Sequence, residues 1–152
     1  MTIYLSLKLV HVISATLLLG TGLGTAFFLW NAVRSGDRGA IRVTARNAIL
    51  ADWVFTTPAV IIQPVTGVML MVELGFRFDS AWFVAVTAIY LLVGACWIPV
   101  VIIQYRLWKL ANGGGELPAQ FYRLFRRWCL LGGPAFTGVL VLFVLMVFKP
   151  GI

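Results

Sequence analysis

The sequence predicts an all-α, polytopic membrane protein: a four-transmembrane-helix bundle that forms a single membrane domain over residues 1–152. Two observations lead to this prediction. Hydrophobic residues make up 61% of the chain and charged residues only 11%, whereas soluble domains carry about 25% charge. The apolar residues also gather in four long stretches, at about residues 4–33, 51–73, 80–107 and 126–148. Each stretch exceeds the roughly 20 residues that a helix needs to cross a bilayer.

The first stretch carries the residue that matters most for function. From Leu9 to Val33 it has no Asp, Glu, Lys or Arg over 25 residues, yet it contains His11, the only histidine of the chain. Lys8 precedes this histidine by about one helical turn. An ionisable side chain inside a membrane span is costly, and by default it marks a functional site. The candidate site is therefore centred on His11.

The other three stretches are more uniform. Between Trp53 and Val72, Gln63 is the only strongly polar side chain, and we expect Asp52 to cap the start of this helix at the cytoplasmic edge. The third stretch, from Ser80 to Tyr105, has Gln104 near its end, and the fourth, from Trp128 to Phe148, has no charge. None shows the alternating pattern of a membrane β-barrel strand.

The connections predict the orientation. Nine of the twelve basic residues lie in two connections, residues 34–52 and 106–127, and only Lys8, Arg77 and Lys149 lie elsewhere. Because cytoplasmic loops carry an excess of Lys and Arg, both termini are expected on the non-cytoplasmic side. The same clustering favours contact with lipid headgroups, so no nucleic-acid partner is expected. Within the second connection, residues 117–127 are expected to form a short amphipathic helix on the membrane surface, with Phe121, Tyr122 and Phe125 toward lipid.

Several roles are open for His11. It can be a structural residue that bonds a neighbouring helix, an axial haem ligand, a proton relay or a metal ligand. With no second histidine, a haem with two histidine ligands is excluded within one chain. Met69 and Met71 lie at a similar predicted depth and are candidates for a second axial ligand, although only one of them can face the bundle. Lys8 either extends its ammonium to the interface or pairs with a propionate of a bound porphyrin.

The small residues and the cysteines of the spans are explained by helix packing. Gly20 and Gly24 form a small-xxx-small pair, which allows close approach of a helix or a flat ligand. Cys96 and Cys129 lack the spacing of a metal site, and we expect them to be unpaired packing residues.

Short motifs in all four stretches resemble the HemJ-type membrane protoporphyrinogen oxidases. These motifs are Tyr4 to Ile13 with a Lys-x-x-His pattern at Lys8 and His11, Thr57-Pro58-Ala59 followed by Gly67, Tyr105 to Lys109, Pro134, and Val147 to Pro150. The whole chain is more closely similar to an uncharacterised family of bacterial integral membrane proteins, within a group that includes HemJ and the CopD-like copper-resistance proteins. The resemblance implies haem b inside the bundle, His11 as the axial ligand, and oxidation of protoporphyrinogen IX with electrons passed to an acceptor such as quinone.

The chain departs from the HemJ pattern at three places: Val60 replaces a methionine, no lysine lies near Trp82, and Gly132-Gly133 replaces an acidic residue. Three functions therefore stay open. The first is a haem-binding redox protein of the inner membrane. The second is a non-catalytic accessory subunit of a larger membrane complex, or a homo-oligomer. The third is CopD-like copper handling.

Overall fold

A computed structural model describes residues 2–149, and all of its regular structure is helical. The elements are α1 (Thr2–Ser35), α2 (Arg38–Ala51), the π-helical turn η1 (Asp52–Thr56), α3 (Thr57–Glu73), α4 (Ala81–Asn112) and α5 (Ala119–Phe148). Since α2, η1 and α3 follow one another without a break, they form one long helix. The structure thus has four helices that are long and apolar enough to cross a membrane, which confirms the predicted fold class.

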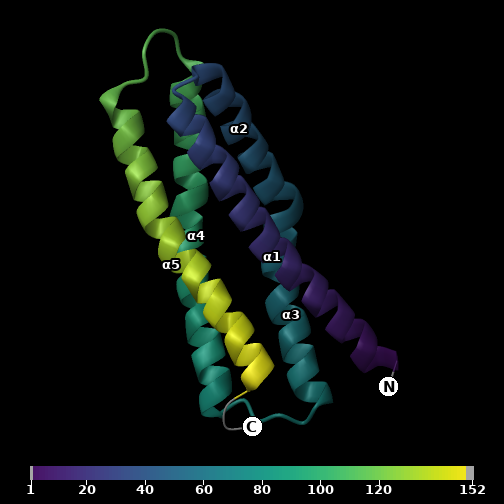
Figure 1. Ribbon diagram of the computed structural model, residues 1–152. Coiled ribbons are helices and arrows are strands. Elements are labelled where there is room, and N and C mark those ends of the chain that lie inside the picture. The colour runs from purple at the N-terminus through teal and green to yellow at the C-terminus, as the bar shows by residue number, and fades with distance from the viewer. Residues whose placement is uncertain (1, 150–152) are drawn as a thin grey trace.

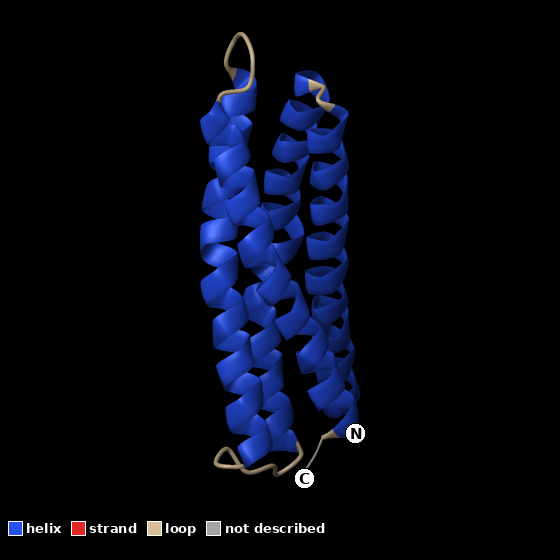
Figure 2. Cartoon of the chain, turned by 60° about the vertical axis from the view of Figure 1, so that its left-hand side comes forward, coloured by secondary structure: helices blue, strands red, loops and turns tan. Residues whose placement is uncertain are grey.

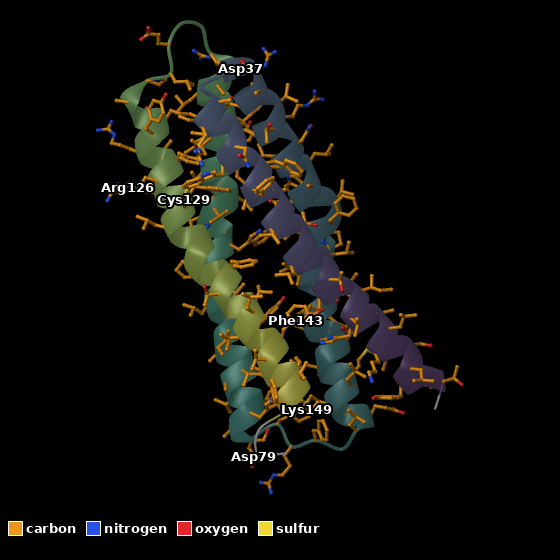
Figure 3. The ribbon with its side chains drawn as sticks, in the orientation of Figure 1. Asp37, Asp79, Arg126, Cys129, Phe143 and Lys149 are labelled. Atoms are coloured by element: carbon orange, nitrogen blue, oxygen red, sulfur yellow. The ribbon has the colours of Figure 1, made fainter. Side chains whose placement is uncertain are left out.

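The four long helices run side by side, and α1 begins at the same end of the molecule where α5 ends (Figures 1 and 2). We call this the terminal end. The opposite end holds the α1–α2 and α4–α5 connections with nine of the basic residues, and we call it the Arg-rich end. Figure 3 labels Asp37 and Arg126 toward the Arg-rich end, and Asp79 and Lys149 at the terminal end. The first and last residues that the structure describes therefore lie at the same end of the bundle, as an even number of spans requires.

The two ends of the bundle are packed differently. Helix α4 packs along α5, and α1 packs against both α2 and α3, while α2 joins the two pairs by packing against α4. At the Arg-rich end the helices enclose a buried apolar core. Its members are Leu29, Ala32, Ile41, Ala45, Val100, Ile103, Leu107, Ala111, Phe121, Leu124 and Trp128. Elsewhere, large apolar side chains on every span are exposed, as expected where lipid is the solvent.

The first Arg-rich connection is helical rather than a loop. Gly36 takes a left-handed φ of 70° at the turn, and the Asp37 carboxylate accepts the Gly39 N–H at 2.7 Å, which caps α2. Arg38, at the start of α2, bonds to the α4–α5 connection. Its guanidinium donates to the carbonyls of Leu110 (2.7 Å) and Ala111 (3.0 Å), and also to that of Gly115. A cation at the end of α4 satisfies the last carbonyls of that helix.

The prediction of a separate surface helix over residues 117–127 is wrong. Helix α5 runs unbroken from Ala119 to Phe148, so these residues are the first turns of a span. Phe121 is fully buried in the core instead of facing lipid, while Tyr122 is exposed and Phe125 is half-buried. The cause is the length of α4 and α5, which extend past the membrane-length stretches and pack on each other there.

Prolines within the spans free backbone carbonyls, and side chains on other helices bond some of them. Pro64 has no N–H for the carbonyl of Val60, four residues earlier, and Tyr90 on α4 donates its hydroxyl to that carbonyl at 2.5 Å. A second bond of this type, from the Trp82 indole N–H on α4 to the Leu145 carbonyl on α5 at 2.7 Å, is not related to a proline, because the Lys149 N–H also donates to that carbonyl. The π-helical turn ends at Thr56, two residues before Pro58, which interrupts the regular bonding pattern.

The short α3–α4 connection carries an exposed ion pair. Arg77 and Asp79 approach to 2.5 Å, and the guanidinium holds the pKa of the Asp79 carboxyl below its usual value. Because both side chains are exposed, this pair contributes little to stability.

Candidate functional site

His11 on α1 lies against α3, where three polar side chains surround it. Its Nδ1 is 2.8 Å from the Thr66 hydroxyl, and its Nε2 is 3.0 Å from the amide nitrogen of Gln63. Ser14, one turn further along α1, donates its hydroxyl to the Gln63 amide oxygen. We call these four residues, His11, Ser14, Gln63 and Thr66, the His11 network. Gly67 completes the fit, since a Cβ there would lie 3.4 Å from the ring Cε1.

The partners assign the protons of the network. The Gln63 oxygen accepts from Ser14, so its nitrogen faces the ring and donates to Nε2. Nε2 is then an acceptor, and the ring proton lies on Nδ1, which donates to the Thr66 oxygen. The Thr66 hydroxyl in turn donates to the Ile62 carbonyl at 2.8 Å. The imidazole is neutral in this arrangement, and both of its nitrogens have partners.

Helical spacing explains how these side chains meet. His11 and Ser14 are three residues apart, as are Gln63 and Thr66, so each pair shares one face of its helix. Gly67 follows on the same face of α3 and lets the ring approach the backbone. Gln63 was visible in the sequence as the only strongly polar side chain of its span. Its pairing with His11 was not, because 52 residues separate the two.

The structure places the other predicted site residues as follows. Lys8 is exposed, with its ammonium 5.7 Å from the Tyr4 ring centroid. Met71 is buried and Met69 is 47% exposed, so only Met71 faces the interior. Cys96 and Cys129 are both free thiols, as predicted.

Gly20 and Gly24 line a groove of about 870 Å³ between α1 and α2. A Cβ added at either glycine would meet no atom within 4 Å, so none of the described helices packs closely on them. The groove does not include His11. A smaller cavity, of about 140 Å³, lies beside Ser14 and Pro58.

A second polar cluster lies inside the bundle, and the sequence analysis missed it. Asp52 does not cap a helix: its backbone is helical (φ −63°, ψ −41°) within the long helix, and its Oδ1 accepts the Thr56 hydroxyl at 2.9 Å. The Gln104 amide and the Trp97 indole of α4 lie beside the carboxyl. We call these four residues the Asp52 site. Its one sequence signal is the i, i+4 spacing of Asp52 and Thr56.

The class of protein follows from the fold: this is a multi-pass integral membrane protein. The chain belongs to the family described as "Predicted integral membrane protein (DUF2269)", whose sequence model matches residues 5–150. Searches of curated proteins and of solved structures find no match.

Proposed function

We propose that this membrane protein binds haem b through His11 and takes part in electron transfer. The observation that supports the proposal is the hydrogen bond from Nδ1–H to Thr66, whose hydroxyl is itself anchored on the Ile62 carbonyl. Metal-bound histidines usually donate their other ring N–H to a fixed acceptor, which sets the tautomer and the ring orientation. Here that tautomer puts the lone pair on Nε2, which accepts a hydrogen bond from the neutral amide of Gln63.

The fit of haem to this site depends on Gln63. The Nδ1, Cε1 and Nε2 atoms of the ring all face α3, where Thr66, Gly67 and Gln63 meet them. An iron therefore reaches Nε2 only when the Gln63 side chain turns away and α1 and α3 separate locally. Met71, the buried methionine, is our candidate for the second axial position, and Lys8 is our candidate partner for a propionate.

Bound haem would supply a one-electron redox centre whose potential depends on its axial ligands. The residues of this chain would orient the ring, keep water away from it and hold its proton on Nδ1. We propose a membrane quinone as the electron partner. HemJ-like porphyrinogen oxidation is the enzymatic form of this proposal.

An optical spectrum tests the proposal. The protein, purified with haem supplied during expression, should show a Soret band and a reduced-minus-oxidised haem b signal. The His11→Ala variant should lose both. Gln63→Ala should bind haem at least as well as the wild type, because it removes the amide that competes for Nε2. Met71→Ala should alter the spectrum, while the matched variant Met69→Ala should not. A colourless wild type would overturn the proposal.

One observation favours a second function, that of a non-catalytic accessory subunit. The α1–α2 groove is lined mostly by small residues and leaves Gly20 and Gly24 uncovered. Small residues of this kind let helices approach closely in membranes. If another subunit or a second copy packs there, Gly24→Leu should shift the protein to a smaller species in mild detergent, with His11 spectra unchanged. An unchanged size would count against this function.

We do not propose copper handling. Among residues 2–149, no group of three or more His, Cys, Asp or Glu side chains could hold a metal ion.

A further inference from the structure

The Asp52 site contains two buried oxygens that no hydrogen bond satisfies. Asp52 is only 4% exposed and Gln104 only 2%. Both Asp52 Oδ2 and Gln104 Oε1 are fully buried and have no hydrogen-bond partner among residues 2–149. Buried polar atoms are nearly always paired, so two unpaired acceptors within one cluster are unusual. Both atoms are oxygen acceptors, so only a hydrogen-bond donor or a cation can satisfy them.

No basic side chain compensates the Asp52 carboxylate. In the part of the chain that the structure describes, the single salt bridge joins Arg77 to Asp79, outside the spans. Arg46, the nearest arginine along the same helix, is exposed. A buried carboxylate without a counter-charge is strongly disfavoured, so it takes up a positive charge from elsewhere.

The other ionisable groups of the neighbouring spans are also accounted for. His11 on α1 is engaged with Gln63 and Thr66, and Tyr90 on α4 donates to Val60. The remaining groups on α4 and α5 are the free thiols Cys96 and Cys129 and a set of exposed side chains near the Arg-rich end, namely Tyr105, Arg106, Lys109, Tyr122, Arg123, Arg126 and Arg127. None of these carries a buried positive charge that would pair with Asp52.

The backbone at this position is irregular as well. Asp52 begins the π-helical turn, and Thr56, its hydrogen-bond partner, ends it. Wide turns of this kind within helices frequently occur at functional sites. In membrane transporters, ions bind where spans depart from regular helical bonding near the middle of the bilayer.

From these observations we propose that Asp52 and Gln104 form a binding site for one exchangeable positive charge, a proton or a Na⁺ ion, inside the membrane. A proton on Asp52 Oδ2 would neutralise the buried carboxylate and leave a hydroxyl beside the Gln104 amide. A Na⁺ ion would instead be bound by the unpaired oxygens. The site is separate from the His11 network and does not depend on haem.

Infrared spectroscopy of the purified protein in lipid tests the proposal. With choline as the only monovalent cation and at neutral pH, the wild type should show the carbonyl band of a protonated carboxyl. Asp52→Asn should lose this band, and Asp79→Asn, which changes an exposed carboxyl, should keep it. Transfer to D₂O should shift the band, because the proton exchanges.

Replacing choline by Na⁺ at equal ionic strength separates the two occupants. A band that survives Na⁺ identifies the proton as the occupant, and a band that Na⁺ removes identifies Na⁺ as its competitor. Gln104→Leu should move the band to higher wavenumber, because the carboxyl loses its partner, and this variant serves if Asp52→Asn does not fold. If wild type and Asp52→Asn give the same spectrum in both salts, Asp52 is an ionised, hydrated carboxylate and the proposal is overturned. That result would leave the haem proposal untouched.

Discussion

The His11 network and the Asp52 site are two polar clusters in one apolar bundle, and they differ in how completely their atoms are paired. In the His11 network each ring nitrogen has a partner within 3.0 Å, and Gln63 bonds to two side chains. In the Asp52 site only one carboxylate oxygen has a partner, and the Gln104 oxygen has none. Each cluster uses one glutamine and one threonine around an ionisable group.

Because of this difference, we expect the two clusters to contribute differently to the stability of the fold. A fully paired network in a low-dielectric interior holds its helices in one arrangement, because breaking it leaves several groups unsatisfied. A partly paired cluster costs stability, and such a cost persists in proteins mainly where it serves binding or exchange. We therefore expect mutations in the two clusters to change stability in opposite directions.

The largest effect should come from removing the imidazole. His11→Leu breaks two interhelical hydrogen bonds, each worth roughly 0.6 kcal/mol and at most about 1.7 kcal/mol in membrane proteins, and it loses the packing on Gly67. We expect a loss of about 2 kcal/mol in the free energy of unfolding. SDS titration in mixed micelles, followed by circular dichroism, measures it. Lys8→Leu, one turn away and exposed, is the control, and an equal loss in both variants would contradict the prediction.

The two glutamines give a matched pair. Gln63→Leu removes bonds to His11 and Ser14 and should cost about 1 kcal/mol. Gln104→Leu removes at most the single interaction of this amide with the Asp52 carboxyl, so its unfolding free energy should stay within about 0.6 kcal/mol of the wild type. The same SDS titration compares them. Equal destabilisation would show that the two clusters are energetically alike.

Asp52→Asn is a smaller change, because it keeps the shape of the side chain and removes only its ability to take up a positive charge. We expect stability equal to the wild type or higher by up to about 1 kcal/mol, since the amide never has to be neutralised in the buried site, whereas the carboxylate does. Circular dichroism during SDS titration again measures the free energy of unfolding. A loss above about 2 kcal/mol would mean that the carboxylate has a partner that stabilises the fold.

The smallest effect should come from Gly67→Ala. The added Cβ would lie 3.4 Å from the ring Cε1, an ordinary contact at its lower limit. We expect less than about 1 kcal/mol of destabilisation, because the neighbouring ring shifts by only a few tenths of an ångström. The ring carbon resonance of His11 in an NMR spectrum should move, while Gly24→Ala should leave it unchanged.

The sequence predicted the elements better than the contacts between them. The four apolar stretches and the position of His11 within the first could be read directly, and the structure confirms four membrane-length helices. The role of Asp52 was predicted wrongly, because an acidic residue before an apolar run has the same local pattern whether it caps a helix or lies inside one. The buried position of Phe121 was missed for a similar reason, since the boundary between a surface segment and a span depends on what packs against it.

By itself, the sequence determined that this chain is a multi-pass membrane protein with both termini on one side. The reason is physical: in a bilayer each span must satisfy its own backbone hydrogen bonds, so the length of an apolar run decides a helix locally. Only the tertiary structure decided that His11 meets Gln63 and Thr66, that Asp52 lies beside Gln104, and that Arg38 holds the end of α4. Those pairs join residues about 50 to 70 positions apart, and they depend on the rotation and register of packed helices, which no single apolar run specifies.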